Sequence, residues 1–415
     1  FRRSWGIALE AGLLPALNAW VRWQDFAEWG NDPYDSRDKL VDDRVGWASL
    51  RGEKSTYYED LTGGITLQHG PLMVLFGRDR VRWGPGRRGD LLLSGESSPL
   101  LQFRLSVRFG PSVQFTSLAG ALHAWPEVAD TLYTAPSGRL RRSLDDKYLS
   151  AHRLEIALSR GLSVGLSEAV VYGERALSLS YLNPVSVYFS DEHDQGDQDN
   201  VILGVDARID PAAGVSAWGE LILDDFRFAK LGSSYFGNKV GWLGGAALAG
   251  PGGILPVEVG AEYAGLRPFV YSHVFPINTF KQWNAPLGLQ LQPNSDRTSF
   301  WAEWWPLASL SAALEAELIR HGENGYENGE WLNAGGDIDL PHREIDPEEA
   351  AFLGGLRRDH TRVQAWTAWW MLENLALHAM IGYDRDDSSE TEGLIGSLTF
   401  SWNAPVDRRW TLRGR

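Results

Sequence analysis

Cysteine is missing from the 415-residue chain, and methionine occurs only three times. A fold without cysteine has no disulfides to depend on, which suits an envelope protein as well as many cytosolic ones. No run of about eighteen or more apolar residues occurs, so a helical membrane span is excluded. Basic residues are also fewer than acidic ones, 39 against 54, which gives a formal net charge of −15. This charge argues against nucleic acid as a partner.

Tryptophan and glycine are abundant instead, with 19 and 45 copies. Transmembrane β-barrels account for this combination. They carry aromatic girdles at both membrane interfaces and glycine in tight strands and turns. Their mean hydropathy is low, here −0.26, because every second residue of a strand faces a polar lumen.

Strict alternation of apolar and polar residues is clearest at 101–109, which reads LQFRLSVRF. Successive side chains of a strand point to opposite faces, so one face is apolar and the other polar. A soluble sheet can show this once, but the pattern recurs at 17–24, 200–209, 257–263, 310–318 and 394–402. Charged residues on so many inner faces would be costly in a sandwich core and are tolerated in a wet lumen.

The connections between these segments alternate in length. Short turns are expected at 70–71, 110–111, 160–161, 211–213, 307–308 and 372–373. Long polar segments separate them, at 25–60, 124–146, 173–199, 224–237, 266–296, 322–359 and 384–392. Short turns on one side and long loops on the other are typical of the periplasmic and extracellular ends of an outer-membrane barrel.

We therefore predict an all-β fold: one domain, 1–415, forming a transmembrane antiparallel β-barrel in the bacterial outer membrane. The pattern gives about 16 strands between Leu14 and Trp402, and segments 4–12 and 408–415 would raise the number to about 18. An export signal is expected to have been removed before Phe1. A barrel this wide needs a plug or conducts solutes, and 25–60 and 173–199 are the candidates to fold inward.

One connection is unusual in composition. Residues 76–94 read FGRDRVRWGPGRRGDLLLS, and their glycines and proline indicate a rigid, shaped turn. Arginines and aspartates crowd this turn. We expect a turn this charged to face water or a charged ligand.

Several short motifs keep their order between residues 57 and 306. They are WGPG at 83–86, LLLS at 91–94, LNP at 182–184, DN at 199–200, ELILDDF at 220–226, RPFVYSH at 267–273, PLG at 286–288 and PNSD at 293–296. In these motifs the chain resembles the capsule assembly Wzi family of outer-membrane proteins. The resemblance implies a barrel of about 18 strands with a plugged lumen. It also implies a lectin, not an enzyme, that holds capsular or exopolysaccharide at the cell surface. From residue 322 onward no motif matches, so the role of the 322–359 loop is left open.

Candidate polysaccharide-binding residues combine aromatic faces for sugar C–H groups with charged groups for hydroxyls and uronates. They are Arg82, Trp83, Arg87, Arg88, Asp90, Asp206, Trp218, Glu220, Trp301 and Trp366. Each has a plainer interpretation. A tryptophan can belong to the lipid-interface girdle, and a one-residue error in register reverses its face. The arginines can pair with lumenal acids or contact lipopolysaccharide phosphate.

Neither a metal site nor a catalytic site is indicated. Residues 191–199 are dense in oxygen ligands, but they lack the spacing of an EF-hand loop, so a solvated acidic loop is the favoured interpretation. The same holds for 384–392. The nine histidines are scattered and none lies in a nucleophile motif. We expect no cofactor and no enzymatic activity.

Three functions remain open from the sequence. The first is a surface lectin that anchors a polysaccharide. The second is a porin or sugar-selective channel, because inward acids and arginines suit a channel equally well. The third is a structural component of a cell-envelope assembly. The expected partners are capsular or exopolysaccharide, outer-membrane lipid and lipopolysaccharide, and possible envelope proteins.

Overall fold

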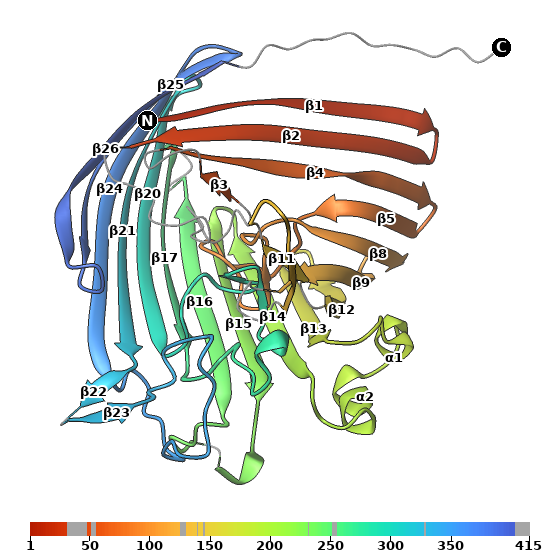
Figure 1. Cartoon of the computed structure of the whole chain (residues 1–415). Helices are drawn as coiled ribbons and strands as arrows, with labels where there is room; N and C mark the ends of the chain where they lie inside the picture. Colours follow the sequence, from red (N-terminus) through yellow and green to blue (C-terminus); the bar gives the residue numbers. More distant parts are fainter. Residues whose placement is uncertain are drawn as a thin grey trace.

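The computed structural model describes residues 1–30, 48–50, 55–124, 130–138, 140–143, 146–230, 232–250, 255–327 and 329–402. Within these residues an 18-stranded antiparallel sheet forms the wall of the molecule. Each long wall strand pairs with the next long wall strand along the chain, so β2 pairs with β4, and the short β3 pairs with β4 as well. Figure 1 shows that this sheet is strongly curved and encloses several loops.

The wall strands are β1 (Arg2–Leu14), β2 (Leu17–Trp29), β3 (Ala48–Leu50), β4 (Ser55–His69), β5 (Leu72–Asp79), β8 (Leu100–Phe109), β9 (Val113–His123), β12 (Asp146–Ser159), β13 (Leu162–Gly173), β14 (Asn200–Ala212), β15 (Val215–Asp225), β16 (Lys239–Ala249), β17 (Val257–Leu266), β20 (Ser295–Leu307), β21 (Leu310–Glu323), β24 (Leu356–Leu372), β25 (Leu375–Asp386) and β26 (Thr391–Trp402).

Small elements lie in the connections: β6 (Arg82–Trp83) with β7 (Leu93–Ser94), β10 (Asp130–Thr134) with β11 (Leu140–Ser143), β18 (Lys281–Gln282) with β19 (Ala285–Pro286), β22 (Gly325–Glu327) with β23 (Glu330–Leu332), helices α1 (Leu179–Leu182) and α2 (Tyr188–Asp194), and the 3-10 turns η2 (Phe228–Lys230) and η4 (Pro276–Asn278). No helix in the described ranges is long and apolar enough to cross a membrane.

The strand count agrees with the sequence pattern. From β2 to β26 the meander contains sixteen strands when the three-residue β3 is left out, and β1 is the expected strand at 4–12. The other expected addition, 408–415, lies outside the described residues. Among those residues β1 and β26 are the two ends of the sheet, and no pairing joins them.

The predicted alternation is confirmed in β8. Leu101 and Phe103 are each 48% exposed on the outer face, whereas Gln102 and Ser106 are buried on the inner face. An apolar face that a soluble protein would have to cover is what a lipid-facing wall requires. The chain therefore presents an apolar exterior and a polar interior, as an outer-membrane barrel does.

Two pairs of consecutive tryptophans contribute to the expected aromatic girdle. Trp304 and Trp305 are both exposed, as are Trp369 and Trp370. The register shifts between Trp304 and Leu307, and again between Trp370 and Leu372. A bulge interrupts strict alternation, so neighbouring rings both reach the surface near the short turns. Rings at that level suit a membrane interface.

The lumen contains a plug formed by residues 80–99 and 267–294. Its apolar residues include Leu91, Leu92, Tyr271 and Phe280, which form one buried cluster with wall residues such as Ile222. The segment 76–94 was expected to face water or a charged ligand. Its Trp83, Asp90 and 91–93 are buried, whereas the side chains of Arg82 and Arg87 stay 52% and 45% exposed. Acids of the wall pair with Arg87 and Arg88.

The segment 173–199 does not enter the lumen, contrary to expectation. Its Tyr181 and Tyr188 pack with Val170, Tyr172 and Val201 in a second buried cluster, separate from the plug. Val170 and Tyr172 alternate with the lumenal Ala169 and Val171 along β13, so this cluster lies on the outer face. Figure 1 accordingly places α1 and α2 outside the curve of the sheet. The segment and the outer face of β13 both present apolar and aromatic side chains, so packing them together is more favourable than placing the segment in a polar lumen.

Candidate functional site

A tight turn between β6 and β7 gives the plug its shape. The buried Asp90 carboxylate accepts the backbone N–H of Gly86 at 2.7 Å and the Nε–H of Arg82 at 2.6 Å. A side-chain carbon at Gly86 would lie 2.0 Å from the carbonyl oxygen of Gly89, so only glycine fits there. Burial raises the pKa of the Asp90 carboxyl, and the Arg82 guanidinium opposes that rise.

Acids of the wall hold the backbone of this turn. The Glu220 carboxylate on β15 accepts the N–H groups of Leu91 at 2.8 Å and Leu92 at 3.2 Å. The Glu262 carboxylate on β17 accepts those of Arg87 at 2.7 Å and Arg88 at 3.1 Å. Charge-assisted hydrogen bonds of this kind are stronger than neutral ones, so the plug is fixed against two strands at once.

Stacked indoles lie under the arginines. The rings of Trp218 and Trp301 are 6.2 Å apart and nearly parallel, and the Trp218 Nε1–H donates to Glu262 at 2.9 Å. A side-chain carbon at Gly245 or Gly260 would come within 2.7 or 2.2 Å of these rings. Glycine on the neighbouring strands therefore lets both indoles lie flat against the wall, a close approach that no other residue permits.

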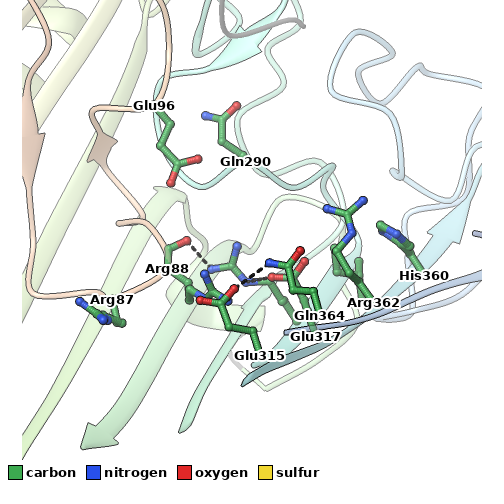
Figure 2. Close-up of a pocket in the computed structure, with 11 residues that line it drawn as sticks. Arg87, Arg88, Glu96, Gln290, Glu315, Glu317, His360, Arg362 and Gln364 are labelled. Atoms are coloured by element: carbon green, nitrogen blue, oxygen red, sulfur yellow. Dashed lines mark hydrogen bonds and ion pairs between the residues drawn. The ribbon is translucent and has the colours of Figure 1, made fainter. Parts of the chain in front are cut away.

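A polar cavity of about 530 Å³ separates the plug from the wall strands β20, β21 and β24. It is shown in Figure 2. Its lining residues are Arg87, Arg88, Glu96, Gln290, Arg297, Glu315, Glu317, Ile319, His360, Arg362 and Gln364. Both charge signs and amide groups converge on this space, as they do in sites that bind polar ligands.

Internal pairs use part of this charge. Arg88 contacts Glu315 at 2.8 Å, and Gln364 donates to the same carboxylate at 2.8 Å. Arg362 donates from Nε to Asp384 at 2.7 Å and its side chain is 40% exposed. Within the described residues, the terminal Nη groups of Arg362 have no hydrogen-bond partner. These Nη groups can therefore donate hydrogen bonds to a ligand while Nε stays bonded to Asp384.

The cavity brings together only some of the sequence candidates. Arg87 and Arg88 line it, and Trp366 lies on the same face of β24 as the lining residues Arg362 and Gln364. Arg82 lies at the exposed side of the plug turn. Five further candidates are buried between plug and wall: Trp83, Asp90, Trp218, Glu220 and Trp301. The last candidate, Asp206, is buried elsewhere in an ion pair with Arg153. A part in polymer binding stays a prediction for all of them.

Sequence reasoning missed the wall side of the cavity. His360, Arg362 and Gln364 alternate along β24 and share the lumenal face with Trp366. The same period-2 reading that selected Trp366 would have selected these three, because alternate residues share one face. Glu315 and Glu317 on β21 follow the same rule. No metal-ligand grouping lies in this cavity; among the described residues such a grouping occurs only on and after α2.

Comparison with known proteins decides the family. The model of the family "Capsule assembly protein Wzi" matches residues 61–386. The chain belongs to the Wzi capsule assembly family. This confirms the resemblance drawn from the motifs between 57 and 306, and it extends the match through β24 and β25, where no motif was visible. No curated protein matches the sequence significantly.

Solved structures agree with the family assignment at the level of the fold. Wzi of Escherichia coli, described as an outer-membrane carbohydrate-binding β-barrel involved in group 1 capsule assembly, has a TM-score of 0.56 at 14% identity and covers 96% of this chain and 82% of its own. OccAB2 of Acinetobacter baumannii has a TM-score of 0.52 at 9% identity, covering 97% and 91%. The Wzi-family chain described here is thus an outer-membrane β-barrel protein.

Proposed function

We propose that this chain is a non-catalytic surface lectin that binds capsular or exopolysaccharide and anchors it to the outer membrane. Membership of the capsule assembly family supports the proposal, as does the carbohydrate binding stated for the Escherichia coli protein. The observation that carries it is the cavity between plug and wall, where Arg362 presents unpaired guanidinium nitrogens to a lining that also includes Arg87 and Arg88.

An acidic polymer suits this chemistry. Guanidinium groups bind carboxylates through two parallel hydrogen bonds, so a uronate can bridge the plug and β24. Neighbouring Gln290 and Gln364 offer amides for hydroxyl groups. The acids of the cavity, Glu315 and Glu317, accept hydrogen bonds from hydroxyls and reject a polymer of uniformly dense negative charge. Uronate spaced by neutral sugars is therefore the substrate class that we propose.

Retention needs no chemical step. Each sugar contact is weak, but a long polymer presents many repeats to many copies of the barrel, so avidity holds it at the surface. We accordingly propose that the chain has no enzymatic activity, and that lipopolysaccharide and envelope proteins are its neighbours in the membrane.

The test is binding of purified, detergent-solubilised protein to polysaccharide from its own source cells, with an unrelated neutral glucan as control. Arg362→Gln and Arg88→Gln should each weaken binding at least about tenfold, because loss of a charge-assisted pair is worth about 1.5–3 kcal/mol. The matched control is Arg208→Gln, which removes an exposed arginine that is paired with Asp210 and is not part of the cavity lining. Equal loss of polysaccharide binding in all three variants would mean that the net charge of the protein, and not the cavity, determines binding.

A channel is the competing function, and the same preparation tests it. Two segments occupy the lumen and are hydrogen-bonded to the wall, which opposes free passage of solutes. Steady conductance in a planar bilayer, together with no selective polysaccharide binding, would replace the lectin by a channel. Selective binding without conductance is the outcome that we expect.

A further inference from the structure

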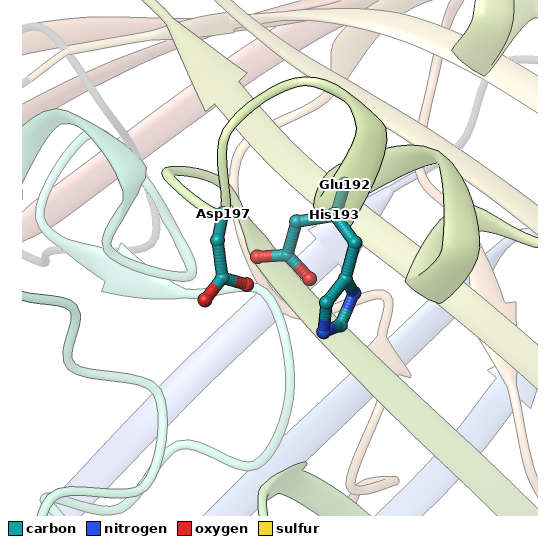
Figure 3. Close-up of side chains that lie close together, drawn as sticks. All are labelled: Glu192, His193 and Asp197. Carbon is teal, nitrogen blue, oxygen red and sulfur yellow. The ribbon is translucent and has the colours of Figure 1, made fainter.

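Three potential metal ligands converge outside the lumen, at the end of α2. Glu192 and His193 come from the last turns of the helix, and Asp197 comes from the turn that follows it. One ligand atom of each lies within 4.8 Å of the other two. Figure 3 shows the Glu192 carboxylate between the Asp197 carboxylate and the His193 ring.

Glu192 is the residue that calls for a ligand. It is only 8% exposed, and within the described residues no hydrogen-bond donor or cation pairs with its carboxylate, although neither oxygen is fully shut off from solvent. Buried carboxylates are ordinarily hydrogen-bonded, paired or bound to a metal ion. The carboxylates of Asp197, Asp199, Asp224 and Asp225 add to the negative potential at this position. A cation is the species that would satisfy the Glu192 carboxylate.

The histidine is prepared for the same role. Its Nδ1 lies 2.6 Å from the carbonyl oxygen of Phe189, one turn earlier in α2. A carbonyl oxygen can only accept, so Nδ1 carries the proton and Nε2 keeps its lone pair. This arrangement, in which the second ring nitrogen donates to a carbonyl, is the usual one for a metal-binding histidine.

We propose that Glu192, His193 and Asp197 bind a divalent transition-metal ion. One imidazole with two carboxylates is a mixed nitrogen and oxygen set that suits zinc, whereas calcium and magnesium take oxygen ligands alone. His193 and Asp197 are exposed, so the ion has an entry path and keeps a coordination position for water or an anionic group. In the sequence, residues 191–199 were compared only with an EF-hand calcium loop. Such a loop binds its ion through oxygen atoms alone, so it is a different kind of site.

The ion would join α2 to the chain that leads into β14. That chain contains Asp199, whose carboxylate accepts the Tyr181 hydroxyl at 2.7 Å. Tyr181 and Tyr188 cover the outer face of β13. Metal binding would therefore hold the α1–α2 segment against the outside of the barrel, because an ion that binds only the closed arrangement stabilises it.

The experiment uses the full chain in detergent, without a histidine tag, stripped with EDTA and dialysed. Zinc is titrated against a chromophoric chelator, with magnesium and calcium in parallel. We expect saturable binding of one zinc ion per chain. Glu192→Gln and His193→Gln should each weaken it at least about tenfold, as loss of groups that orient a metal already does. Heat-modifiable migration on gels confirms that each variant retains its barrel.

Asp194→Asn is the matched control. It removes one exposed carboxylate from the same helix but lies outside the ligand group, so its affinity should stay within about twofold of wild type, inside the usual surface-substitution range. Zinc should also protect the α1–α2 segment from protease in wild type and Asp194→Asn alone. The proposed site is wrong if zinc does not bind saturably, or if all three variants bind zinc equally weakly. Either result would indicate a diffuse acidic surface instead.

Discussion

The Glu220 carboxylate accepts the backbone N–H of Leu91 at 2.8 Å, across 129 residues of sequence. It also accepts the N–H of Leu92, so one wall side chain satisfies two donors of the plug. Both donors are buried, and buried donors without acceptors are costly. The position of the plug therefore depends on an acid in the middle of β15.

Replacing that acid should loosen the plug without opening the wall. In Glu220→Gln one oxygen still accepts, but the amide NH₂ faces the second N–H, so local stability should fall by about 1–3 kcal/mol. Hydrogen exchange at Leu91 and Leu92 measures this loss. Glu10→Gln, at an exposed position of β1, is the control and should leave both amides protected. Unchanged protection in Glu220→Gln would show that the plug is held by its apolar cluster instead.

Gly86→Ala should distort the turn that carries the cavity arginines. The added carbon would meet the backbone oxygen of Gly89 at 2.0 Å, and overpacking of this kind costs about 1–3 kcal/mol. We expect weaker polysaccharide binding with normal amounts of protein in the membrane. Gly393→Ala adds the same carbon in β26, where nothing lies within 4 Å, and should bind as wild type does. Equal binding by the two variants would contradict the steric argument.

Asp90 gives a pH dependence with a defined sign. Its pKa in the folded chain lies above the ordinary value of 3.8, so the folded chain holds this proton more tightly than the unfolded chain does. The stability contributed by Asp90 is then fully present below about pH 4 and is lost as the pH rises through the folded-state pKa. Asp90→Asn cannot titrate.

Apparent melting temperatures of wild type and Asp90→Asn, compared between about pH 4 and pH 7, measure this effect. The advantage of wild type over the variant should shrink as the pH rises. A difference that grows with pH would mean that Arg82 outweighs burial and that the carboxyl is easier to ionise in the folded chain.

Arg153 and Asp206 form a buried ion pair inside the wall, with Nη2 donating to Oδ1 at 3.0 Å. Arg153→Met alone should cost about 3–5 kcal/mol, because it leaves the Asp206 charge unpaired. Adding Asp206→Leu should recover most of that loss in reversible denaturant unfolding in lipid. The exposed pair of Arg208 and Asp210 provides the comparison, with at most about 1 kcal/mol for its disruption. An additive result for the buried pair would contradict the coupling.

The wall was predictable because its signal is local. A period of two residues fixes the faces of a strand, so 101–109 and the extra strand at 4–12 were placed correctly. Even the number of strands between Leu14 and Trp402 followed from the alternation of turns and loops. The paired exposure at Trp304 and Trp305 did not, because a bulge breaks the period on which the prediction relied.

The interior was harder to predict because its contacts span long stretches of sequence. Residues 76–94 donate backbone N–H groups to Glu220 and Glu262 and pair the Arg88 side chain with Glu315, and no local pattern reveals which distant acid a given group will face. The segment 173–199 was wrongly expected inside, since length and polarity do not distinguish the two faces of a wall. Cavity residues such as Arg362 were within reach of alternation, but only the tryptophan in that strand was chosen.

The bonds from the plug to Glu220 and Glu262 also determine how the protein responds to pulling. If the proposed polymer binds between Arg88 and Arg362, it pulls on the plug and on β24 together. The plug passes its share to β15 and β17 through four backbone N–H groups, and those strands are laterally hydrogen-bonded to their neighbours. Drag on such a polymer would thereby be spread over several wall strands, and no single loop would have to bear it.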